Sequence, residues 1–321
     1  MSELLTIEAR VRDISDIARG VKSLELEAAD GRVLPATLAG QYIDVSLTPG
    51  VTRSYSLLDP SSVNPKVYRI AVALSADSRG GSRAVHQSIR EGDLLTISPP
   101  SGGFVPNEDA PHSVFIAGGI GITPIYAMIA QLTASGRSWE LHYASPSRER
   151  AAFLAEILEQ KPSNLSSVTL YISDESGPRS MRVANIVEVS KPGAHLYCCG
   201  PSPLIDDFLA ATRHRPADTV HLERFTNDTD PAKGGFTVEL AQSGMTLEIE
   251  ENESILDAVL DAGIMIDFSC EEGICGSCRT RVLEGTPDHR DSILTTTERE
   301  AGDTMFICCS GSKGERLVLD L

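Results

Sequence analysis

Hydrophobic and polar side chains alternate along the first third of the chain. Leu5, Ile7, Ala9 and Val11 are separated by polar residues, which is the two-residue period of a half-buried β-strand. Further short runs of this kind are bounded by Gly, Pro and Asp turn signals: 21–27, 42–47, 67–74 and 94–98. We therefore expect an antiparallel β-barrel domain over residues 1–108.

The pattern changes to strand–helix alternation between residues 109 and 226. Expected strands are 114–117, 140–144, 168–172, 196–199 and 220–222, and expected helices are 125–135, 151–160 and 203–214. In the first helix Ile125, Met128, Ile129 and Leu132 share one face, which suits packing on a sheet. This order predicts an α/β domain with an open parallel sheet.

A polar segment at residues 227–235 has the composition of a linker and separates this domain from residues 236–321. The last domain begins with an expected hairpin, 236–240 with 246–249. A helix should follow from Ser254, whose capping box reaches Asp257, and end at Gly263. The sequence thus predicts three domains.

Charge is distributed unevenly in this chain of 321 residues. The formal net charge is −17, and residues 227–321 carry −13 of it, which disfavours nucleic-acid and anionic-lipid partners. There is no basic leader and no run of roughly 20 apolar residues, so we expect a cytoplasmic protein without a membrane segment. The composition, 41% hydrophobic and 23% charged, is that of a fully folded chain.

Four of the seven cysteines have a diagnostic spacing. Cys270, Cys275 and Cys278 form C-x4-C-x2-C, and Cys308 follows after 29 intervening residues. A zinc site would normally need a second Cys or His pair, and none follows Cys278. Residues 236–321 resemble plant-type ferredoxins, which implies an α+β β-grasp fold with these four cysteines holding a [2Fe-2S] cluster. Gly273 and Gly276 would let the loop direct backbone N–H groups at the sulfurs.

The fourth ligand must be chosen between adjacent cysteines. Residues 305–308 read as a short apolar strand, on which successive side chains face opposite ways, so Cys308 and Cys309 should not both reach the cluster. The ferredoxin-like ending places the ligand thirteen residues before the end, at Cys308. Cys309 is then expected to be a plain thiol.

Three further segments occur in a meaningful order. A glycine-rich turn between a strand and a helix can hold a pyrophosphate at the helix N-terminus. Together with two other segments it resembles the ferredoxin–NADP reductase superfamily. The three segments are Arg53-Ser54-Tyr55-Ser56, the turn with Gly118, Gly119, Gly121, Thr123 and Pro124, and Cys199-Gly200-Pro201.

This resemblance implies roles for individual residues. Tyr55 should pack on a flavin, Ser56 should lie near its N5 atom, and Arg53 should reach its phosphate. Cys199 and Gly200 should face the nicotinamide, so that Ser56 and Cys199 are the candidate catalytic residues. Taken alone, Arg53 and Tyr55 would be an ordinary strand pair, and it is the occurrence of all three segments in the expected order that favours the flavin role. A buried structural cysteine is the competing interpretation of Cys199, and for Cys198 we favour that role.

The complete order of domains resembles the phthalate dioxygenase reductase family, in which the ferredoxin is C-terminal. That likeness implies FMN rather than FAD, with Arg79, Gly80, Gly81 and Ser82 in a turn around its phosphate and Phe225 against the flavin site. A surface turn and an interdomain core residue are the competing interpretations. The C-terminal ending 317–321 adds to the likeness.

The family likeness also implies a donor and an acceptor. We expect NADH rather than NADPH, because no arginine cluster beyond Arg148 is evident and Asp174 would repel a 2′-phosphate. A solvated loop carboxylate is the competing interpretation of Asp174. The acceptor would be a Rieske-type oxygenase, to which a monomeric reductase passes single electrons. A redox-sensing protein and a diaphorase without a dedicated partner remain the alternatives.

Overall fold

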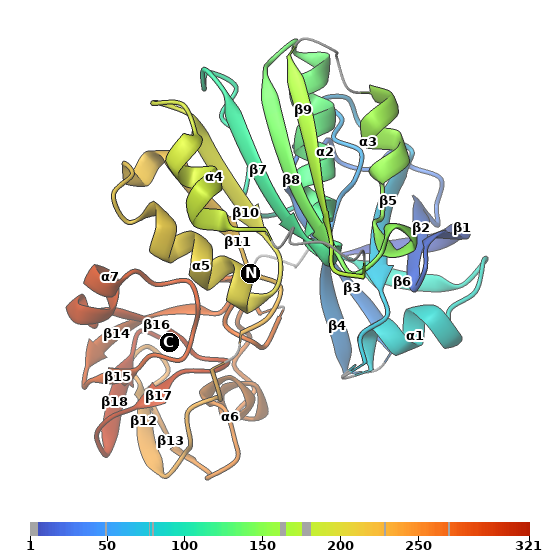
Figure 1. Cartoon of the computed structure of the whole chain (residues 1–321). Coiled ribbons are helices and arrows are strands. Elements are labelled where there is room, and N and C mark those ends of the chain that lie inside the picture. The colour runs from blue at the N-terminus through green and yellow to red at the C-terminus, as the bar shows by residue number, and fades with distance from the viewer. Residues whose placement is uncertain are drawn as a thin grey trace. The chain divides into compact units, whose positions relative to one another are not determined.

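The computed structural model describes residues 6–321 apart from 49, 77, 79, 161–164, 175–180, 228 and 269. The chain forms two compact units, Met1–Phe225 and Thr226–Leu321 (Figure 1). Among the residues described, no helix is long and apolar enough to cross a bilayer.

The first unit starts with a six-stranded antiparallel sheet in the order β4-β3-β6-β1-β2-β5. Leu58 N, just beyond β4, donates to Arg69 O on β5 at 2.9 Å, which draws the two end strands together into a barrel. The elements are β1 Ile7–Ala18, β2 Val21–Ala28, β3 Tyr42–Thr48, β4 Val51–Ser56, β5 Val67–Ala73, helix α1 Gly81–Gln87 and β6 Leu94–Ile97.

Alternation places the barrel strands correctly. In β1 the side chains of Ile7, Ala9 and Val11 are buried while Glu8 and Arg10 are exposed, as the period-two pattern predicts. The predicted barrel is confirmed. The segment expected as a turn at Gly80 and Gly81 leads into helix α1, with Gly80 at its N-cap. The hydrophobic pattern did not predict strand β4.

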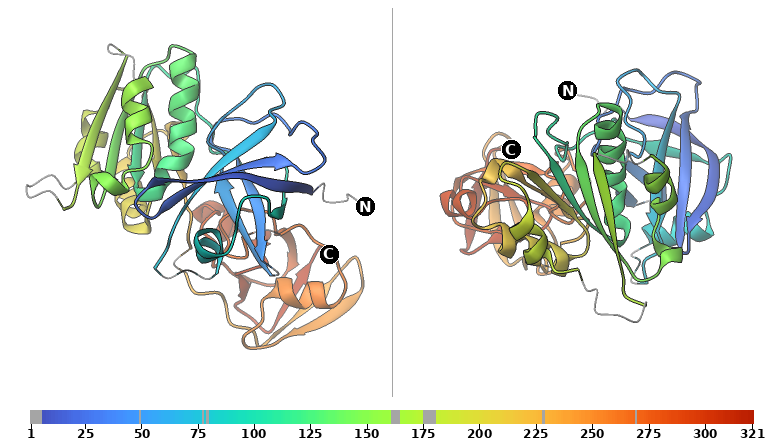
Figure 2. Two further views of the ribbon diagram at one scale, coloured as in Figure 1. Left: turned by 90° about the vertical axis from the view of Figure 1, so that its right-hand side faces the viewer. Right: turned by 45° about the horizontal axis from the view of Figure 1, so that its top comes forward.

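The rest of this unit is a parallel sheet in the order β11-β10-β7-β8-β9. Two clusters of buried residues show α2 and α3 packed on one face and α4 and α5 on the other, which Figures 1 and 2 also show. The elements are β7 Ser113–Gly118, α2 Ile122–Ala134, β8 Trp139–Ser145, α3 Leu154–Gln160, β9 Ser166–Ile172, α4 Val183–Val189, β10 His195–Cys199, α5 Ser202–Thr212 and β11 Val220–Glu223, with 3-10 turns at 119–121, 148–150 and 217–219.

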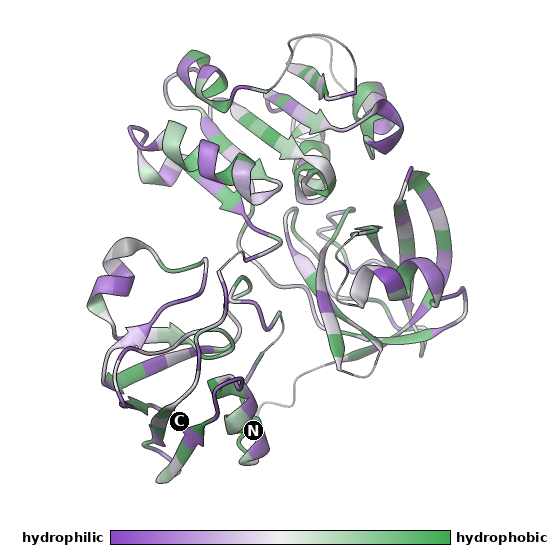
Figure 3. Ribbon diagram, turned by 60° about the horizontal axis from the view of Figure 1, so that its bottom comes forward, coloured by the Kyte–Doolittle hydropathy of each residue, from purple (hydrophilic) through white to green (hydrophobic). Residues whose placement is uncertain are grey.

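The predicted parallel sheet is confirmed, with differences at element ends. Helix α2 begins at Ile122 rather than Ile125, because Pro124 is tolerated in the first turn, where its missing N–H has no helical partner. Helix α4 was not predicted. Hydrophobic residues lie along the strands of this sheet in Figure 3, as both of its faces are covered.

Hydrogen bonds of one arginine, Arg69, connect the barrel to this sheet within the first unit. Arg69 on β5 makes two 2.8 Å hydrogen bonds to Asp59 and one of 3.4 Å to the hydroxyl of Tyr126 on α2. Its guanidinium also lies 5.7 Å from the Tyr126 ring centroid, and that ring stacks on Phe153. The barrel and the sheet therefore share one buried contact region.

The second unit is a mixed five-stranded sheet, β13-β12-β18-β14-β16, with helix α6 packed on it in the β-grasp arrangement predicted. Capping boxes start both helices, Ser254 with Asp257 as expected and Thr295 with Glu298. Its elements are β12 Phe236–Leu240, β13 Met245–Ile249, α6 Ile255–Asp261, β14 Arg279–Glu284, β15 Pro287–Asp288, α7 Thr296–Ala301, β16 Thr304–Phe306, β17 Gly311–Ser312 and β18 Arg316–Leu319.

Candidate functional site

The four predicted ligand cysteines come together in the second unit. The side chain of Cys308 contacts those of Cys270 and Cys278, and Cys270 contacts Cys275. Hydrogen bonding from the Cys275 and Cys308 thiols lowers the pKa of Cys270, and the same contacts raise the pKa values of those two thiols, so the sulfurs lie close enough to act on one another. Backbone N–H groups of Glu272 and Ile274 point at the Cys270 sulfur, at 3.3 and 3.4 Å. Sulfur donors with N–H groups directed at them suit an iron–sulfur cluster.

Cys308 and Cys309 lie in a turn. Strand β16 ends at Phe306, so the expected strand through residue 308 is wrong, and alternation does not separate the two thiols. Cys308 contacts Cys270 and Cys278, whereas the contacts of the Cys309 sulfur are with Cys308, with the carbonyl oxygen of Phe306 at 3.8 Å and with the space beside Gly273.

Two glycines shape the ligand loop as expected. Gly273 and Gly276 have φ values of +68° and +86°, which L side chains rarely adopt. A Cβ at Gly273 would also lie 2.4 Å from the sulfur of Cys309 and 2.9 Å from Cα of Asp291. The carbonyl of Gly273 accepts the backbone N–H of Ser292 at 3.0 Å, so the segment after Asp291 closes on this loop.

The predicted flavin segment forms β4 of the barrel. Burial raises the pKa of the Tyr55 phenol to about 12, so it stays protonated. Ser54 donates to Asp44 at 2.6 Å, and Gly81 packs on Arg53, where an added Cβ would lie 2.8 Å from the Arg53 Cγ. Gly80 caps α1, and the hydroxyl of Ser82 accepts the backbone N–H of Ser75. Arg79 lies outside the described residues.

The glycine-rich turn and the Cys199-Gly200-Pro201 segment are in direct contact. Ala117 and Cys199 are paired on adjacent strands, and a Cβ at Gly121 would lie 2.3 Å from the Cys199 carbonyl oxygen. A Cβ at Gly118 would lie 2.7 Å from Pro201. Two segments about 80 residues apart in sequence thus meet at one edge of the sheet, where the strands of an open parallel sheet end.

The same edge meets the barrel. Thr123 on α2 donates to Ser56 at the end of β4, at 3.4 Å, and Phe225 packs on the shared buried region. Cys199 is fully buried, and burial raises the pKa of its thiol well above the ordinary value, so it stays neutral and can act only by packing. Cys198 is buried too, on the opposite face with α4 and α5.

Glu223 is a functional candidate that the sequence did not indicate. It ends β11 and pairs with Cys199. Although the residue keeps some exposed surface, its Oε2 atom is inaccessible and finds no hydrogen-bond partner among the described residues. Burial raises the pKa of this carboxyl to about 8. It can therefore hold a proton near neutral pH beside the predicted nicotinamide site.

Glu223 should make stability fall as pH rises. Its folded pKa of about 8 exceeds its ordinary value of 4.5, so the folded chain keeps a proton that the unfolded chain loses. This contribution is full below pH 4.5 and is lost as pH rises through 8, by up to about 1.4 kcal/mol per pH unit. Glu223→Gln should flatten the fall. Melting temperatures at pH 5.5 and 8.5 check this, and an equal difference between the two proteins at both values would contradict it.

Two cavities follow the carboxyl ends of the sheet strands. One, of about 240 Å³, reaches from Gly119 and Ile120 to the barrel residues Ala73 and Leu74. The other, of about 580 Å³, lies against Asp174 at the end of β9 and is lined by Arg19, Arg148 and Arg150. The expectation that no arginine cluster extends beyond Arg148 is therefore wrong, because the sequence neighbour Arg150 and, through the fold, Arg19 line the same cavity.

Two family models match the chain. The 2Fe-2S iron-sulfur cluster binding domain covers residues 238–312, and the oxidoreductase NAD-binding domain covers residues 115–209. These ranges contain the four-cysteine set and the glycine-rich edge.

Curated relatives match over almost their whole length. The phthalate dioxygenase reductase of Burkholderia cepacia is 37% identical over 98% of this chain and 97% of its own. The tetrachlorobenzoquinone reductase of Sphingobium chlorophenolicum is 41% identical over 98% of both chains. A solved structure of a phthalate dioxygenase reductase superposes with a TM-score of 0.77 at 36% identity, covering 99% of this chain and 98% of that one.

Proposed function

The chain belongs to the phthalate dioxygenase reductase family, and from this membership we propose that it is the NADH-dependent reductase component of a Rieske-type oxygenase system. The observation that carries the proposal is the chain-long match to such reductases, with the NAD-binding and 2Fe-2S domains in the same order. The enzyme is an oxidoreductase. Its cofactors are FMN and a [2Fe-2S] cluster, and its donor is NADH.

Residues of this chain fit these groups. The bound flavin and cluster convert a two-electron donor into single-electron transfers. The Gly118–Pro124 turn would hold the pyrophosphate of NADH, and Cys199 with Gly200 would pack against its nicotinamide. Tyr55 and Ser56 would line the flavin, and Thr123 fixes Ser56 at the junction of barrel and sheet. The chemistry needs orientation and exclusion of water more than an acid or base.

We propose Cys270, Cys275, Cys278 and Cys308 as the cluster ligands. Support comes from the mutual contacts of their side chains and from the N–H groups directed at Cys270. For the phosphate of FMN we propose the segment from Arg79 to Ser82 together with Arg53. The packing of Gly81 on Arg53 supports a close approach of these two parts of the barrel.

The identity of the flavin is directly testable. We expect heat or acid to release FMN alone, because the chain-long likeness is to a reductase family that uses FMN. Mass spectrometry of the released cofactor checks this. Recovery of FAD would contradict it.

The reductase role has its own test. Purified protein should oxidise NADH rapidly with cytochrome c as the acceptor and more slowly with NADPH. Negligible turnover with cytochrome c would favour the redox-sensing alternative. The relative named as a tetrachlorobenzoquinone reductase makes quinones the competing acceptor, so a quinone that outcompetes every oxygenase component would favour the diaphorase alternative.

Acidity of the second unit should steer electron delivery. Residues 227–321 carry a net charge of −13, which attracts a basic surface on the acceptor protein. The rate of oxygenase reduction should therefore fall severalfold as salt rises through about 0.1–0.2 M. Ferricyanide, a small anion, serves as the control and should not show this loss. If the rate of oxygenase reduction did not change with salt concentration, the negative charge of residues 227–321 would serve solubility alone.

Three finer points are also proposals. We propose functional domains at residues 1–108, 109–226 and 236–321, joined by a linker at 227–235, with the compact-unit boundary after Phe225 as support for the last division. We propose a monomer, as a single chain carries every cofactor site. We propose a cytoplasmic location, where NADH is available.

A further inference from the structure

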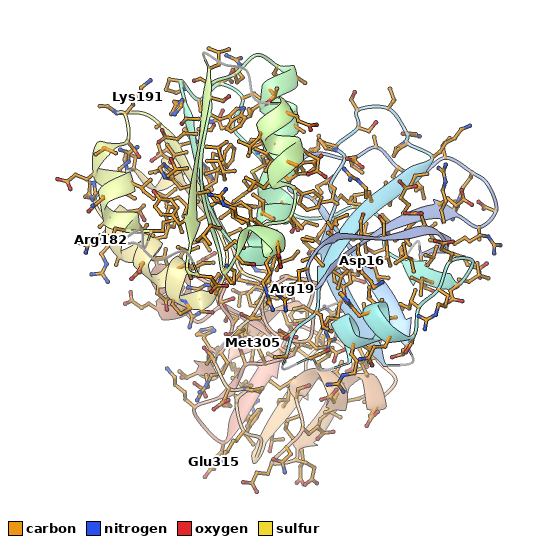
Figure 4. All side chains as sticks on the ribbon, turned by 45° about the vertical axis from the view of Figure 1, so that its right-hand side comes forward. Asp16, Arg19, Arg182, Lys191, Met305 and Glu315 are labelled. Carbon is orange, nitrogen blue, oxygen red and sulfur yellow. The ribbon has the colours of Figure 1, made fainter. Side chains whose placement is uncertain are left out.

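The turn between β1 and β2 lies at the edge where the barrel meets the sheet, and Figure 4 labels Arg19 there. Arg19 and Gly20 form a two-residue connection, with Ala18 paired to Val21 and a Gly20 φ of +76°. Two backbone hydrogen bonds hold this turn. Arg19 N donates to the Glu149 carbonyl at 2.7 Å, and Leu74 N donates to the Gly20 carbonyl at 2.9 Å. The barrel thus presents Arg19 at a fixed point of the sheet edge.

The guanidinium of Arg19 is held far less firmly than its backbone. Its one described ion pair is to Glu149, at 3.5 Å, and both side chains are about 70% exposed (69% and 71%). Such an exposed pair contributes little to stability. The geometry therefore leaves the charge of Arg19 able to turn toward a ligand.

Arg19 borders both cavities at this edge. The smaller cavity starts at Gly119 and Ile120, the predicted pyrophosphate turn, and the larger ends at Asp174. They share Arg19, Pro146 and Arg150, so the two cavities adjoin at Arg19, between the predicted pyrophosphate turn and Asp174. A phosphate-rich nucleotide suits three arginines, and Asp174 can accept ribose hydroxyls.

We propose that Arg19, supplied by the flavin-binding barrel, is a binding residue for the ADP half of the dinucleotide. This rests on the proposed function and deepens it. The barrel then does more than hold flavin, because its β1–β2 turn completes the nucleotide site built by the sheet. The barrel and the parallel sheet then both bind NADH. Holding the ADP half at Arg19 helps to orient the nicotinamide at the other end of the dinucleotide.

The test compares Arg19→Ala with two matched variants of the holoenzyme. Arg19→Ala should raise KM for NADH about tenfold and leave kcat with saturating ferricyanide within twofold, since a charge-assisted hydrogen bond to phosphate is lost. The dissociation constant of ADP-ribose, measured by calorimetry, should rise in parallel, and Arg19→Lys should recover part of both. Arg12→Ala removes a nearby arginine, on β1, that pairs with Glu25 outside both cavities, so it should change neither quantity.

Glu149→Gln separates binding from structure. It breaks the same ion pair as Arg19→Ala but leaves the cation in place, so KM should fall or hold rather than rise. Equal increases of KM for NADH in Arg19→Ala and Glu149→Gln would mean that the Arg19–Glu149 ion pair has only a structural role. An Arg19→Ala protein with unchanged KM and ADP-ribose affinity would overturn the inference while leaving the function intact. A wild-type protein that neither oxidises NADH nor binds ADP-ribose would overturn the proposed function itself.

Discussion

Cys308→Ser should abolish the visible absorbance of the iron–sulfur cluster. The rate of cytochrome c reduction should fall to a small fraction of the wild-type rate. A serine hydroxyl is a poor replacement for a thiolate ligand, and Cys308 alone contacts both Cys270 and Cys278 among the described cysteines. The first unit forms a separate compact body, so NADH should still reduce ferricyanide in this variant. Iron content, the visible spectrum and the two acceptor assays measure the effect.

Cys309→Ser is the matched control, one residue away in the same turn. The Cys309 sulfur lies near the Phe306 carbonyl and the Ser310 hydroxyl, each at 3.8 Å, where a serine hydroxyl also fits. The cluster spectrum should stay nearly unchanged. If Cys309→Ser loses iron and Cys308→Ser keeps it, the fourth ligand is Cys309.

Gly121→Ala should lower kcat/KM for NADH by about a hundredfold, the scale expected when a bound group is displaced by roughly 1 Å. The new methyl would lie 2.3 Å from the Cys199 carbonyl oxygen and 2.7 Å from Gly200 N. Both are backbone atoms, one in strand β10 where Cys199 pairs with Ala117 of β7 and the other in the next residue, so they cannot move aside cheaply. The turn must shift instead, and with it the pyrophosphate and the nicotinamide.

Gly103→Ala controls for the glycine itself. It lies in the same unit, and its added methyl meets no described atom within 4 Å, so kinetics should match the wild type. The cluster spectrum should be retained in both variants, because the cysteines belong to the other unit. Wild-type kcat/KM in Gly121→Ala would show that the turn does not set the nicotinamide position.

Local signals in the sequence predicted most of the architecture. Alternation located β1, and the box of Ser254 with Asp257 located the start of α6, because both depend on residues that are near neighbours in the chain. Helices α1, α4 and α7 were missed. Each has only six or seven residues, so a repeated hydrophobic period contributes little, and no start signal was recognised before any of them.

Some residues of the candidate site were also predicted by local signals in the sequence, and others were not. Cysteine spacing indicated the cluster ligands, and motif order indicated the family, since a loop that binds a cofactor must carry its residues at fixed intervals. By contrast, no pattern revealed Glu223, whose pKa rises to about 8 only because other elements bury its carboxyl. The strand argument for Cys308 was wrong in its geometry, because β16 ends two residues earlier at Phe306.

By itself, the sequence determined what chemistry this protein can carry and in which order, because ligand types and spacings are properties of the chain. The tertiary structure alone decided which distant residues share a site. Arg19 and Arg150 are 131 positions apart, and they border the same cavities because the β1–β2 turn is hydrogen-bonded to Glu149 across the barrel–sheet junction. Contacts of this kind depend on long-range packing, which no local periodicity encodes.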